Sequence, residues 1–346
     1  MTTIRDLAQH CGVSTATVSR ALAGKDYIRE ELRQQIQQAA KQLGYRPNLV
    51  ARNLRSSRST TIGLVVADVQ NPYFTRICRA VEDEALRQGY AVFLCNTDED
   101  AIKEELYLRH LVDENVAGVI LAPTGKTAVD PATLKSLHLP LVVIDRPVNA
   151  NVADSVLIDN AQAAADLTRH LLDHGRRRIA GLFGANSPTG RERALGFWQA
   201  IEERGIARND CQENFIAPRE EDGYRTTQKL LAARPFPDAI LVSNGLAATG
   251  AYRALLESGL RCPEDVSFAA FDDAAWTSLV RPAVTVIEQP TYEIGSAATE
   301  LLLKRIEDHS RSHRQLVLRH RLVVRESCGS HKASEPLDSV DAGQAI

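Results

Sequence analysis

The chain has 346 residues, of which 44% are hydrophobic and 25% are charged, and its formal net charge is −3. This is the composition of an ordinary globular protein, and it excludes disordered, collagen-like and fibrous chains. At roughly 100–200 residues per domain, the length predicts about two or three domains.

Positive charge is concentrated at the N-terminal end of the chain. Residues 1–60 contain 10 Lys and Arg but only 4 Asp and Glu, so this block carries +6 and the remainder carries −9. A basic block on an acidic body is typical of a protein that binds a polyanion at one end, because each neutralised phosphate releases counterions. A solvated positive face would explain the charge alone equally well.

The N-terminal sequence Met-Thr-Thr-Ile-Arg-Asp lacks the apolar stretch of a secretory signal, and no window holds about 18 consecutive apolar residues. We therefore expect a cytoplasmic protein that does not span a membrane. The six cysteines lie far apart, without CxxC or Cys/His clusters. Their spacing predicts neither a zinc site nor a disulfide framework, and we expect no cofactor.

Residues 1–45 predict three short helices joined by tight turns. Gly12, Gly24 and Gly44 mark the expected turns and helix ends, and apolar residues recur at helical spacing between them. The first two helices fit a helix-turn-helix, because Gly12 can make the turn and because Ala8 and Val18 are small enough for the helices to cross closely. An ordinary helical hairpin is the alternative.

The second helix of this motif can enter a DNA major groove. We expect Thr15, Ala16 and Arg20 to face the bases, with Arg20 able to make a bidentate contact to guanine. Thr17 and Ser19 are expected to bond phosphates instead.

Residues 46–59 form a polar linker with one short helical stretch, which Pro47 starts and a Ser/Arg-rich run ends. With three turns or fewer and little apolar support, this helix is expected to order only when something packs against it. At the other end of the chain, residues 329–346 are polar and have no leucine heptads, which predicts a disordered tail rather than a coiled coil.

From Thr61 onward, apolar β-prone runs alternate with amphipathic helical segments such as Phe74–Gln88. This alternation predicts parallel sheets covered on both faces, the doubly wound α/β class, and the number of runs indicates two lobes. The predicted strands are Ile62–Ala67, Ala91–Cys95, Val116–Ala122, Leu141–Ile144, Ser155–Ile158, Ile179–Phe183, Ala239–Val242, Val266–Phe271 and Val284–Ile287.

These features together resemble the lactose-repressor/galactose-repressor (LacI/GalR) family of bacterial transcription regulators over about residues 2–328. The resemblance is carried by Thr3–Leu22, Tyr45–Leu54, Ile62–Val66, Asn71–Phe74, Ile158–Asn160, Arg193–Phe197, Pro263–Ser267 and Phe271–Asp273. It implies a helix-turn-helix head (1–45), a hinge helix and linker (46–59) and a two-lobed effector-binding and dimerisation domain similar to periplasmic sugar-binding proteins (60–328). Lobe 1 would hold about 60–159 and 290–318, and lobe 2 about 160–289 and 319–328.

The resemblance also assigns roles within the linker, whose helix would fold when the dimer sits on its operator. Leu54 would wedge into the minor groove, where the kink that it permits compensates the cost of unstacking bases. Asn48 is a further expected DNA contact, Ala51 would pack across the dimer, and Arg55 would touch phosphate. From the residues alone, Leu54 reads as a small core residue.

A ligand cleft is expected at the ends of the strands, where open α/β sheets bind small molecules. The candidate lining residues are Tyr73, Phe74, Arg146, Arg191, Arg193, Asn244, Asp272 and Trp276. The resemblance implies that Arg193 and Asp272 anchor hydroxyls or carboxylates, and Gly245 stands where many relatives carry an acidic residue.

Several of the candidates have a plainer interpretation. Asp145 and Arg146 could form a surface ion pair, Phe74 could be core, and Asp273 could cap a helix. Arginines nevertheless converge on the expected cleft, with Arg219 as a further candidate, and an arginine fork suits a carboxylate. We therefore expect a monosaccharide-type effector, with a sugar acid as a specific hypothesis.

The expected function is that of a homodimeric DNA-binding transcription regulator, most simply a repressor. It would bind near-palindromic double-stranded operator DNA, and a small sugar or sugar-acid effector would control it allosterically as inducer or corepressor. An enzyme is disfavoured: Gly125-Lys126-Thr127 resembles a phosphate loop, but Ile120 stands where that loop needs glycine, and Pro123 would disturb its backbone donors. A sugar-binding transport component is the other alternative, and the basic N-terminal motif in place of a signal peptide argues against it.

Overall fold

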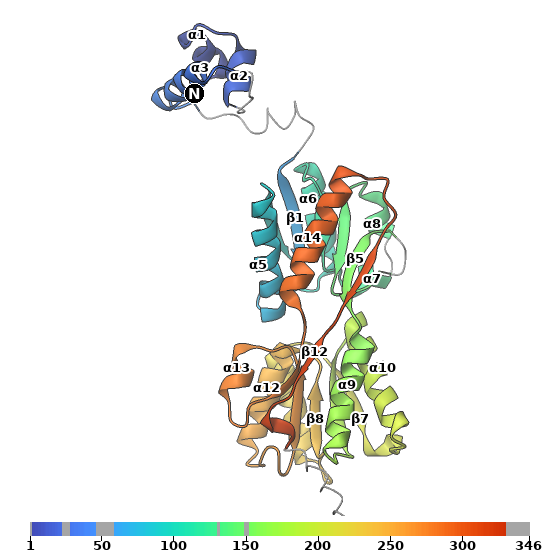
Figure 1. The fold of residues 1–346 in the computed structure, drawn as a ribbon. Coiled ribbons are helices and arrows are strands. Elements are labelled where there is room, and N and C mark those ends of the chain that lie inside the picture. The colour runs from blue at the N-terminus through green and yellow to red at the C-terminus, as the bar shows by residue number, and fades with distance from the viewer. Residues whose placement is uncertain (1, 23–27, 46–58, 130–131, 149–151, 330–346) are drawn as a thin grey trace, which may run out of the picture. The chain divides into compact units, whose positions relative to one another are not determined.

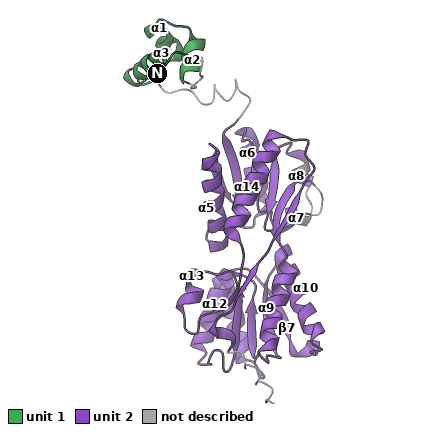
Figure 2. Cartoon of the chain, in the orientation of Figure 1, with its two compact units in different colours: residues 1–59 green, residues 60–346 purple. Residues whose placement is uncertain are grey.

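The computed structural model of the protein describes residues 2–22, 28–45, 59–129, 132–148 and 152–329. The chain divides into two compact units, Met1–Ser59 and Thr60–Ile346 (Figure 2). The predicted hinge helix, with Asn48, Ala51, Leu54 and Arg55, lies outside the described residues, and so does the predicted tail beyond Gly329.

Unit 1 contains the three predicted helices, α1 (Ile4–His10), α2 (Thr15–Leu22) and α3 (Glu30–Gln42). The turn between α1 and α2 places Gly12 at φ +63°, a conformation that glycine adopts without strain. The Ser14 hydroxyl accepts a hydrogen bond from the Thr17 N–H at 3.1 Å and so caps α2. Leu7, Val18 and Ile36 are fully buried and join the three helices in one small core.

Unit 2 consists of two lobes, each built on a six-stranded sheet (Figure 1). All strand pairs are parallel except the pair of β10 with β12, which confirms the doubly wound α/β class. In lobe 1 the order is β11 (Gln315–Leu318), β5 (Asp154–Ile158), β4 (Leu141–Ile144), β3 (Val119–Leu121), β1 (Thr61–Val66) and β2 (Ala91–Asn96). In lobe 2 it is β12 (Arg321–Val323), β10 (Thr285–Glu288), β9 (Ser267–Phe271), β8 (Ala239–Val242), β6 (Ile179–Gly184) and β7 (Gln212–Ile216).

Helices cover both faces of each sheet, and separate apolar clusters fill the two sides. The helices of lobe 1 are α5 (Pro72–Arg87), α6 (Ala101–Asp113), α7 (Gly125–Val129), α8 (Ala132–Ser136) and α14 (Thr291–Glu307). Those of lobe 2 are α9 (Asn160–Asp173), α10 (Pro188–Glu203), α11 (Glu220–Ala232), α12 (Gly245–Glu257) and α13 (Ala275–Leu279), with short 3-10 turns η1 (Arg208–Asp210) and η2 (Glu326–Cys328).

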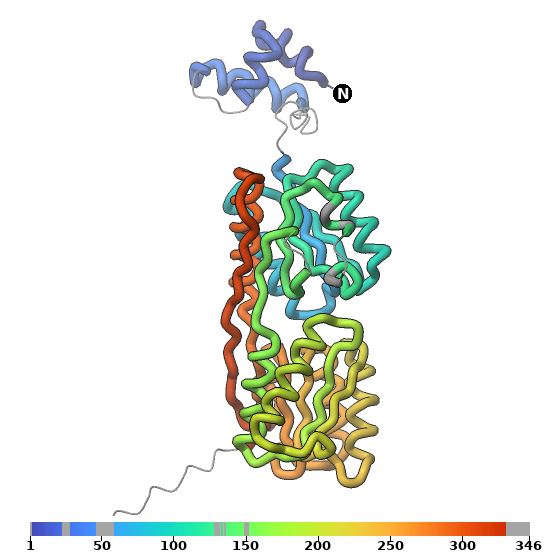
Figure 3. Tube along the Cα trace, turned by 90° about the vertical axis from the view of Figure 1, so that its right-hand side faces the viewer, coloured from blue at the N-terminus to red at the C-terminus, as the bar shows by residue number. Residues whose placement is uncertain are grey.

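The chain passes between the lobes three times, from β5 to α9, from β10 to α14, and from β11 to β12. In Figures 1 and 3 the red C-terminal segment runs from α14 and β11 in one lobe into β12 in the other. Neither lobe is therefore a continuous piece of sequence, and a rotation of one lobe against the other must bend three connections.

Three strands were missed by the sequence analysis: β7, β11 and β12. Each lies at the edge of its sheet, where one side of the strand meets water. In β11, exposed residues alternate with half-buried ones, and its apolar run is only three residues long and is flanked by polar residues. The edge strand β2 was predicted, but it leaves Phe93 and Leu94 about half exposed instead of covered.

A buried ion pair in lobe 1 joins α14 to the sheet. Arg305 of α14 donates to Asp154 of β5 at 3.0 Å, and both side chains are buried. We expect Arg305→Ala to lower the free energy of unfolding by about 3–5 kcal/mol, because a buried carboxylate loses its partner. Urea unfolding of the full chain measures this change.

The same helix offers a matched control. Lys304 pairs with Glu300 at 3.5 Å on the exposed side of α14, and Lys304→Ala should change the free energy of unfolding by less than about 1 kcal/mol. Equal losses in the two variants would show that the buried pair has no special role.

Candidate functional site

A cleft of about 890 Å³ lies between the two lobes of unit 2. Its lining residues follow the carboxyl ends of strands from both sheets: β1, β2, β3 and β4 in lobe 1, and β6, β7, β8, β9 and β10 in lobe 2. Open parallel sheets bind ligands at these ends, so the position agrees with the predicted effector cleft. The volume is enough for a ligand of monosaccharide size.

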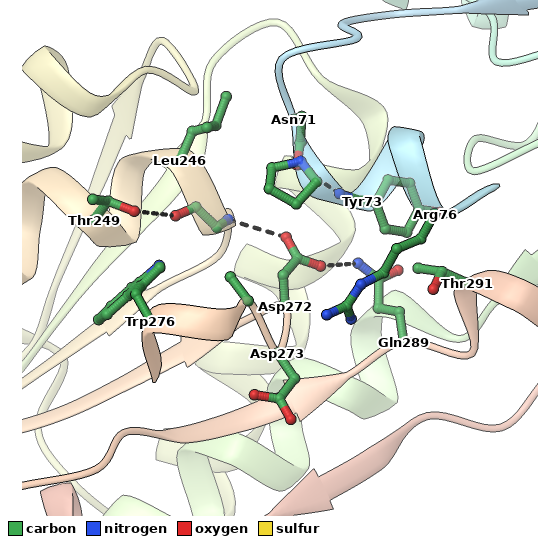
Figure 4. Close-up of a pocket in the computed structure, with 13 residues that line it drawn as sticks. Asn71, Tyr73, Arg76, Leu246, Thr249, Asp272, Asp273, Trp276, Gln289 and Thr291 are labelled. Carbon is green, nitrogen blue, oxygen red and sulfur yellow. Dashed lines mark hydrogen bonds between the residues drawn. The ribbon is translucent and has the colours of Figure 1, made fainter. Parts of the chain in front are cut away.

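Asp272 stands at the centre of the lobe 2 side of the cleft, directly after β9. Its carboxylate accepts hydrogen bonds from the Gly245 N–H at 3.0 Å and from Gln289 Nε2 at 2.7 Å, one to each oxygen (Figure 4). A Cβ on Gly245 would lie 3.2 Å from Oδ2 of Asp272. Glycine at 245 therefore has a structural reason: it lets the first N–H of α12 reach the carboxylate.

Arg193 projects from α10 and is buried at the back of the cleft. Its Nε donates to Asn160 Oδ1 at 2.8 Å, one terminal nitrogen donates to the Ser243 carbonyl, and the guanidinium carbon lies 4.1 Å from the centre of the Phe271 ring. These contacts fix the plane of the guanidinium, so its other terminal nitrogen can donate to a ligand without reorganisation.

On the lobe 1 side, Tyr73 and Asp145 are buried together. Burial raises the pKa of Asp145, although Arg146, Arg193 and a hydrogen bond from Tyr73 act in the opposite direction. Burial also raises the pKa of Tyr73 well above its usual range, so its hydroxyl stays a donor. This pair offers hydroxyl and carboxylate oxygens to a ligand that makes hydrogen bonds.

The expected role of Arg146 as an anion-binding fork is not what the structure shows. Its guanidinium binds both carboxylate oxygens of Glu99, donates to the Pro123 carbonyl at 3.0 Å and pairs with Asp145 at 3.1 Å. Burial disfavours its charge, but the two carboxylates raise its pKa above the ordinary value. The suggested Asp145–Arg146 ion pair exists but is buried. Arg146 joins Glu99, Pro123 and Asp145, so its guanidinium is already occupied and is not open to a ligand.

The remaining candidates divide into those that line the cleft and those that do not. Asn244 lines it and caps α12, because its Oδ1 accepts from the N–H groups of Leu246 and Ala247. Phe74 lines it and also belongs to the core of lobe 1. Trp276 instead lines a small side pocket that shares Asp272 with the cleft (Figure 4). Arg191 is exposed and is not a lining residue, which corrects that expectation.

Asp273, next to Asp272, had a helix cap as its plainer interpretation. It instead binds Arg325 through both carboxylate oxygens, at 2.9 and 2.7 Å, and accepts from the Thr277 hydroxyl. This contact joins the C-terminal segment of lobe 2 to the loop that carries Asp272.

Many lining residues were not predicted from the sequence, and two of them, Glu99 and Gln289, hold predicted site residues in place. Gln289 follows β10 just as Asp272 follows β9, so the strand-end rule could have found it. Glu99 lies in a loop after an edge strand and has a positive φ of 61°. The sequence of this polar loop is typical of an exposed loop and does not indicate that Glu99 contacts Arg146.

In unit 1, α2 presents the residues that the helix-turn-helix motif predicts at its surface. Thr15, Ala16 and Arg20 are exposed, whereas Thr17 and Ser19 are partly covered. The hydroxyls of Thr17 and Ser14 lie 2.9 Å apart, so Thr17 also serves the helix cap. Within the described residues, no helix is long and apolar enough to cross a membrane.

Comparisons with known proteins agree with this arrangement. The family described as "Bacterial regulatory proteins, lacI family" matches residues 3–48, and "Periplasmic binding proteins and sugar binding domain of LacI family" matches residues 59–326. The chain is 38% identical to the ribose operon repressor of Halalkalibacterium halodurans over 97% of this chain and 99% of that protein.

Two solved structures extend the comparison. A Lac repressor dimer bound to operator and the anti-inducer ONPF is 25% identical, covers 95% of this chain and 99% of its own, and has a TM-score of 0.86. A LacI family regulator from Enterococcus faecium with bound ribose is 30% identical, covers 78% of this chain and 98% of its own, and has a TM-score of 0.71. A basic helix-turn-helix unit, a two-lobed cleft and these matches over nearly the whole length show that the chain belongs to the LacI family of DNA-binding transcriptional regulators, whose members are repressors and not enzymes.

Proposed function

We propose that this chain is the repressor of a sugar-utilisation operon and that its effector is a neutral monosaccharide, of which ribose is the first candidate. The observation that carries the proposal is that Asp272 and Arg193 both line the cleft from lobe 2, each held by neighbours and each with hydrogen-bonding capacity left. Sugar hydroxyls both donate and accept, so a fixed carboxylate and a fixed guanidinium suit them together. The similarity to a ribose operon repressor and to a regulator with bound ribose supports the choice of sugar.

The charges of the cleft favour a neutral sugar over the sugar acid that the sequence suggested. Carboxylates outnumber cationic side chains among the lining residues, and one of the cations, Arg146, is already paired with two carboxylates. The acidic residues are Asp68, Asp98, Glu99, Asp145, Glu220 and Asp272, and the basic ones are Lys126, Arg146, Arg193 and Arg219. Among the buried cations a ligand carboxylate would meet only one terminal nitrogen of Arg193, and Arg219 is exposed, so the attraction would not compensate the repulsion from the six carboxylates.

The DNA target follows from the head and from symmetry. A two-fold dimer that presents two copies of α2 needs an operator with two half-sites in near-palindromic order. Arg20, exposed on α2, is the proposed base-reading residue, with Thr15 and Ala16 beside it and Thr17 and Ser19 at phosphates. Asn48, Ala51, Leu54 and Arg55 remain proposed contacts of the hinge helix, and the protein would act in the bacterial cytoplasm.

Effector control requires the ligand to bind the two arrangements of the lobes with different affinity. Lining residues come from both lobes, so any ligand that spans the cleft favours one lobe arrangement over the other. The linkers that lead to the two heads start at β1 of lobe 1, and their separation in the dimer would change with that arrangement. This coupling is compatible with a ligand that lowers operator affinity (an inducer) and with one that raises it (a corepressor).

Calorimetric titration of the full chain tests the nature of the effector. We expect D-ribose to bind and D-ribonate not to bind, because carboxylates outnumber cations in the cleft and neither of its buried arginines keeps an open two-nitrogen fork. Asp272→Asn should weaken ribose binding by about 10- to 100-fold, the value of one or more hydrogen bonds to a charged group. Asp113→Asn, a change at an exposed carboxylate at the end of α6, is the control. Tight ribonate binding with no ribose binding would reject the neutral-sugar proposal.

Operator binding by fluorescence anisotropy tests the DNA head, with a fragment selected from genomic DNA and a scrambled copy of it. Arg20→Ala should reduce the preference for the operator by roughly 1–3 kcal/mol if its contact is bidentate. Lys41→Ala removes an exposed positive charge from α3 and should weaken both complexes alike. An unchanged preference in the Arg20 variant would exclude that side chain as a base reader.

A further inference from the structure

Two loops from opposite lobes touch at one rim of the cleft. Gly125 is the first residue of α7 in lobe 1, and Asn186 follows β6 in lobe 2. A Cβ built on Gly125 would lie closer to the carbonyl oxygen of Asn186 than the 3.0 Å that real Cβ atoms keep, and 3.8 Å from Cδ of Pro188. Both loops also line the cleft. The absence of a side chain at position 125 is therefore what lets the two backbones meet.

Gly125 differs in this respect from the other crowded glycines of the described residues. Gly190, Gly196, Gly223 and Gly250 would also place a Cβ against backbone, but always against backbone of their own lobe. Those positions serve packing within a lobe. Among these glycines, only Gly125 contacts backbone of the other lobe, so its contact with Asn186 depends on how the two lobes are arranged.

The lobe 1 side of this contact is held by a buried carboxylate. Glu104 of α6 is 1% exposed, and it accepts hydrogen bonds from the Thr124 N–H at 2.6 Å and from the Thr127 hydroxyl. Burial raises the pKa of Glu104, while these hydrogen bonds act in the opposite direction. A carboxylate is costly to bury without partners, so its bonds to both sides of Gly125 fix the start of α7 firmly. This also explains Gly125-Lys126-Thr127: the Thr127 hydroxyl serves Glu104.

The lobe 2 side is fixed by its own backbone. Asn186 has a positive φ of 55°, which asparagine tolerates better than most residues. The Ala185 N–H before it donates to the Ile216 carbonyl at 2.7 Å, and the Ser187 hydroxyl after it accepts from the Gly190 N–H at 3.3 Å to cap α10. Neither loop can shift relative to its own lobe without breaking these bonds. The distance between the two loops therefore changes only when the lobes move.

We propose that the Gly125–Asn186 contact is an interlobe stop that sets how far the cleft closes, and that Glu104 is the residue that positions it. A methyl group at position 125 would hold the lobes apart at this rim. The effect on ligand affinity rests on the proposed function, because it assumes that the effector binds the closed arrangement more tightly. The effect on the contact itself does not depend on any ligand.

Hydrogen exchange of the full-length protein without ligand tests the contact. In Gly125→Ala we expect the amides of residues 124–128, 185–187 and 189–190 to exchange about tenfold faster than in the wild type, as the two loops lose their mutual protection. The φ of Gly125 lies outside the left-handed range, so alanine fits the same helical backbone and the thermal midpoint should not fall. Ala132→Val, which enlarges an exposed side chain on α8, should leave residues 185–190 unchanged.

A second variant tests the positioning role of Glu104 from within lobe 1. Glu104→Gln replaces one acceptor oxygen by a donor facing Thr124 or Thr127, and it should also speed exchange at residues 185–190 in the other lobe. Glu105→Gln, at the exposed neighbour on α6, should not. Unchanged exchange at residues 185–190 in both the Gly125 and Glu104 variants would overturn the proposal.

D-ribose titration separates this proposal from the proposed function. If the wild type binds ribose, Gly125→Ala should bind it about tenfold more weakly. If the wild type does not bind ribose but the exchange results hold, the choice of effector is wrong and the interlobe stop stands.

Discussion

The structure of unit 2 depends on one constraint: the parallel strands of both sheets end at the same gap between the lobes. Polar side chains at strand ends are brought together there, and those that are buried must find hydrogen-bond partners. Asp272 bridges the N-terminus of α12 and Gln289, and Arg193 bridges Asn160 and Ser243. The ligand site is thus built from groups that first stabilise their own lobe, and binding uses the capacity that remains.

The position of a site residue can be predicted from the sequence, but its bonds to distant residues of its own lobe cannot. Asn244 and Asp272 were predicted to line the cleft because each follows a strand whose periodicity is plain, whereas Arg193, which lies inside α10, drew its expected role from the resemblance. The central strands were predicted because both of their faces are apolar. Arg146 was placed correctly but given the wrong role, since nothing in its neighbourhood in the sequence shows that Glu99, 47 residues away, occupies its fork. Edge strands such as β11 were not predicted because their apolar runs are short and lie between polar residues.

The pairing of arginines with carboxylates decides which ligands the cleft can take. An arginine counts toward anion binding only if its fork is open, and burial makes an already formed pair hard to exchange for a new one. Arg146 is committed in this way, while Arg193 keeps one terminal nitrogen. A count of arginines near the cleft is therefore not a count of anion-binding groups, because the contacts of each guanidinium decide what it can still bind.

The coupling free energy between ligand binding and operator binding comes only from contacts that differ between the two lobe arrangements. Bonds within a lobe, such as that of Arg305 with Asp154, stabilise both arrangements equally and cannot transmit a signal. Groups that face each other across the gap can, and they include lining side chains from both lobes and the backbone pair at Gly125 and Asn186. Three connecting segments allow the lobes to move, so the size of the allosteric response depends on how these few cross-gap contacts divide between the two arrangements.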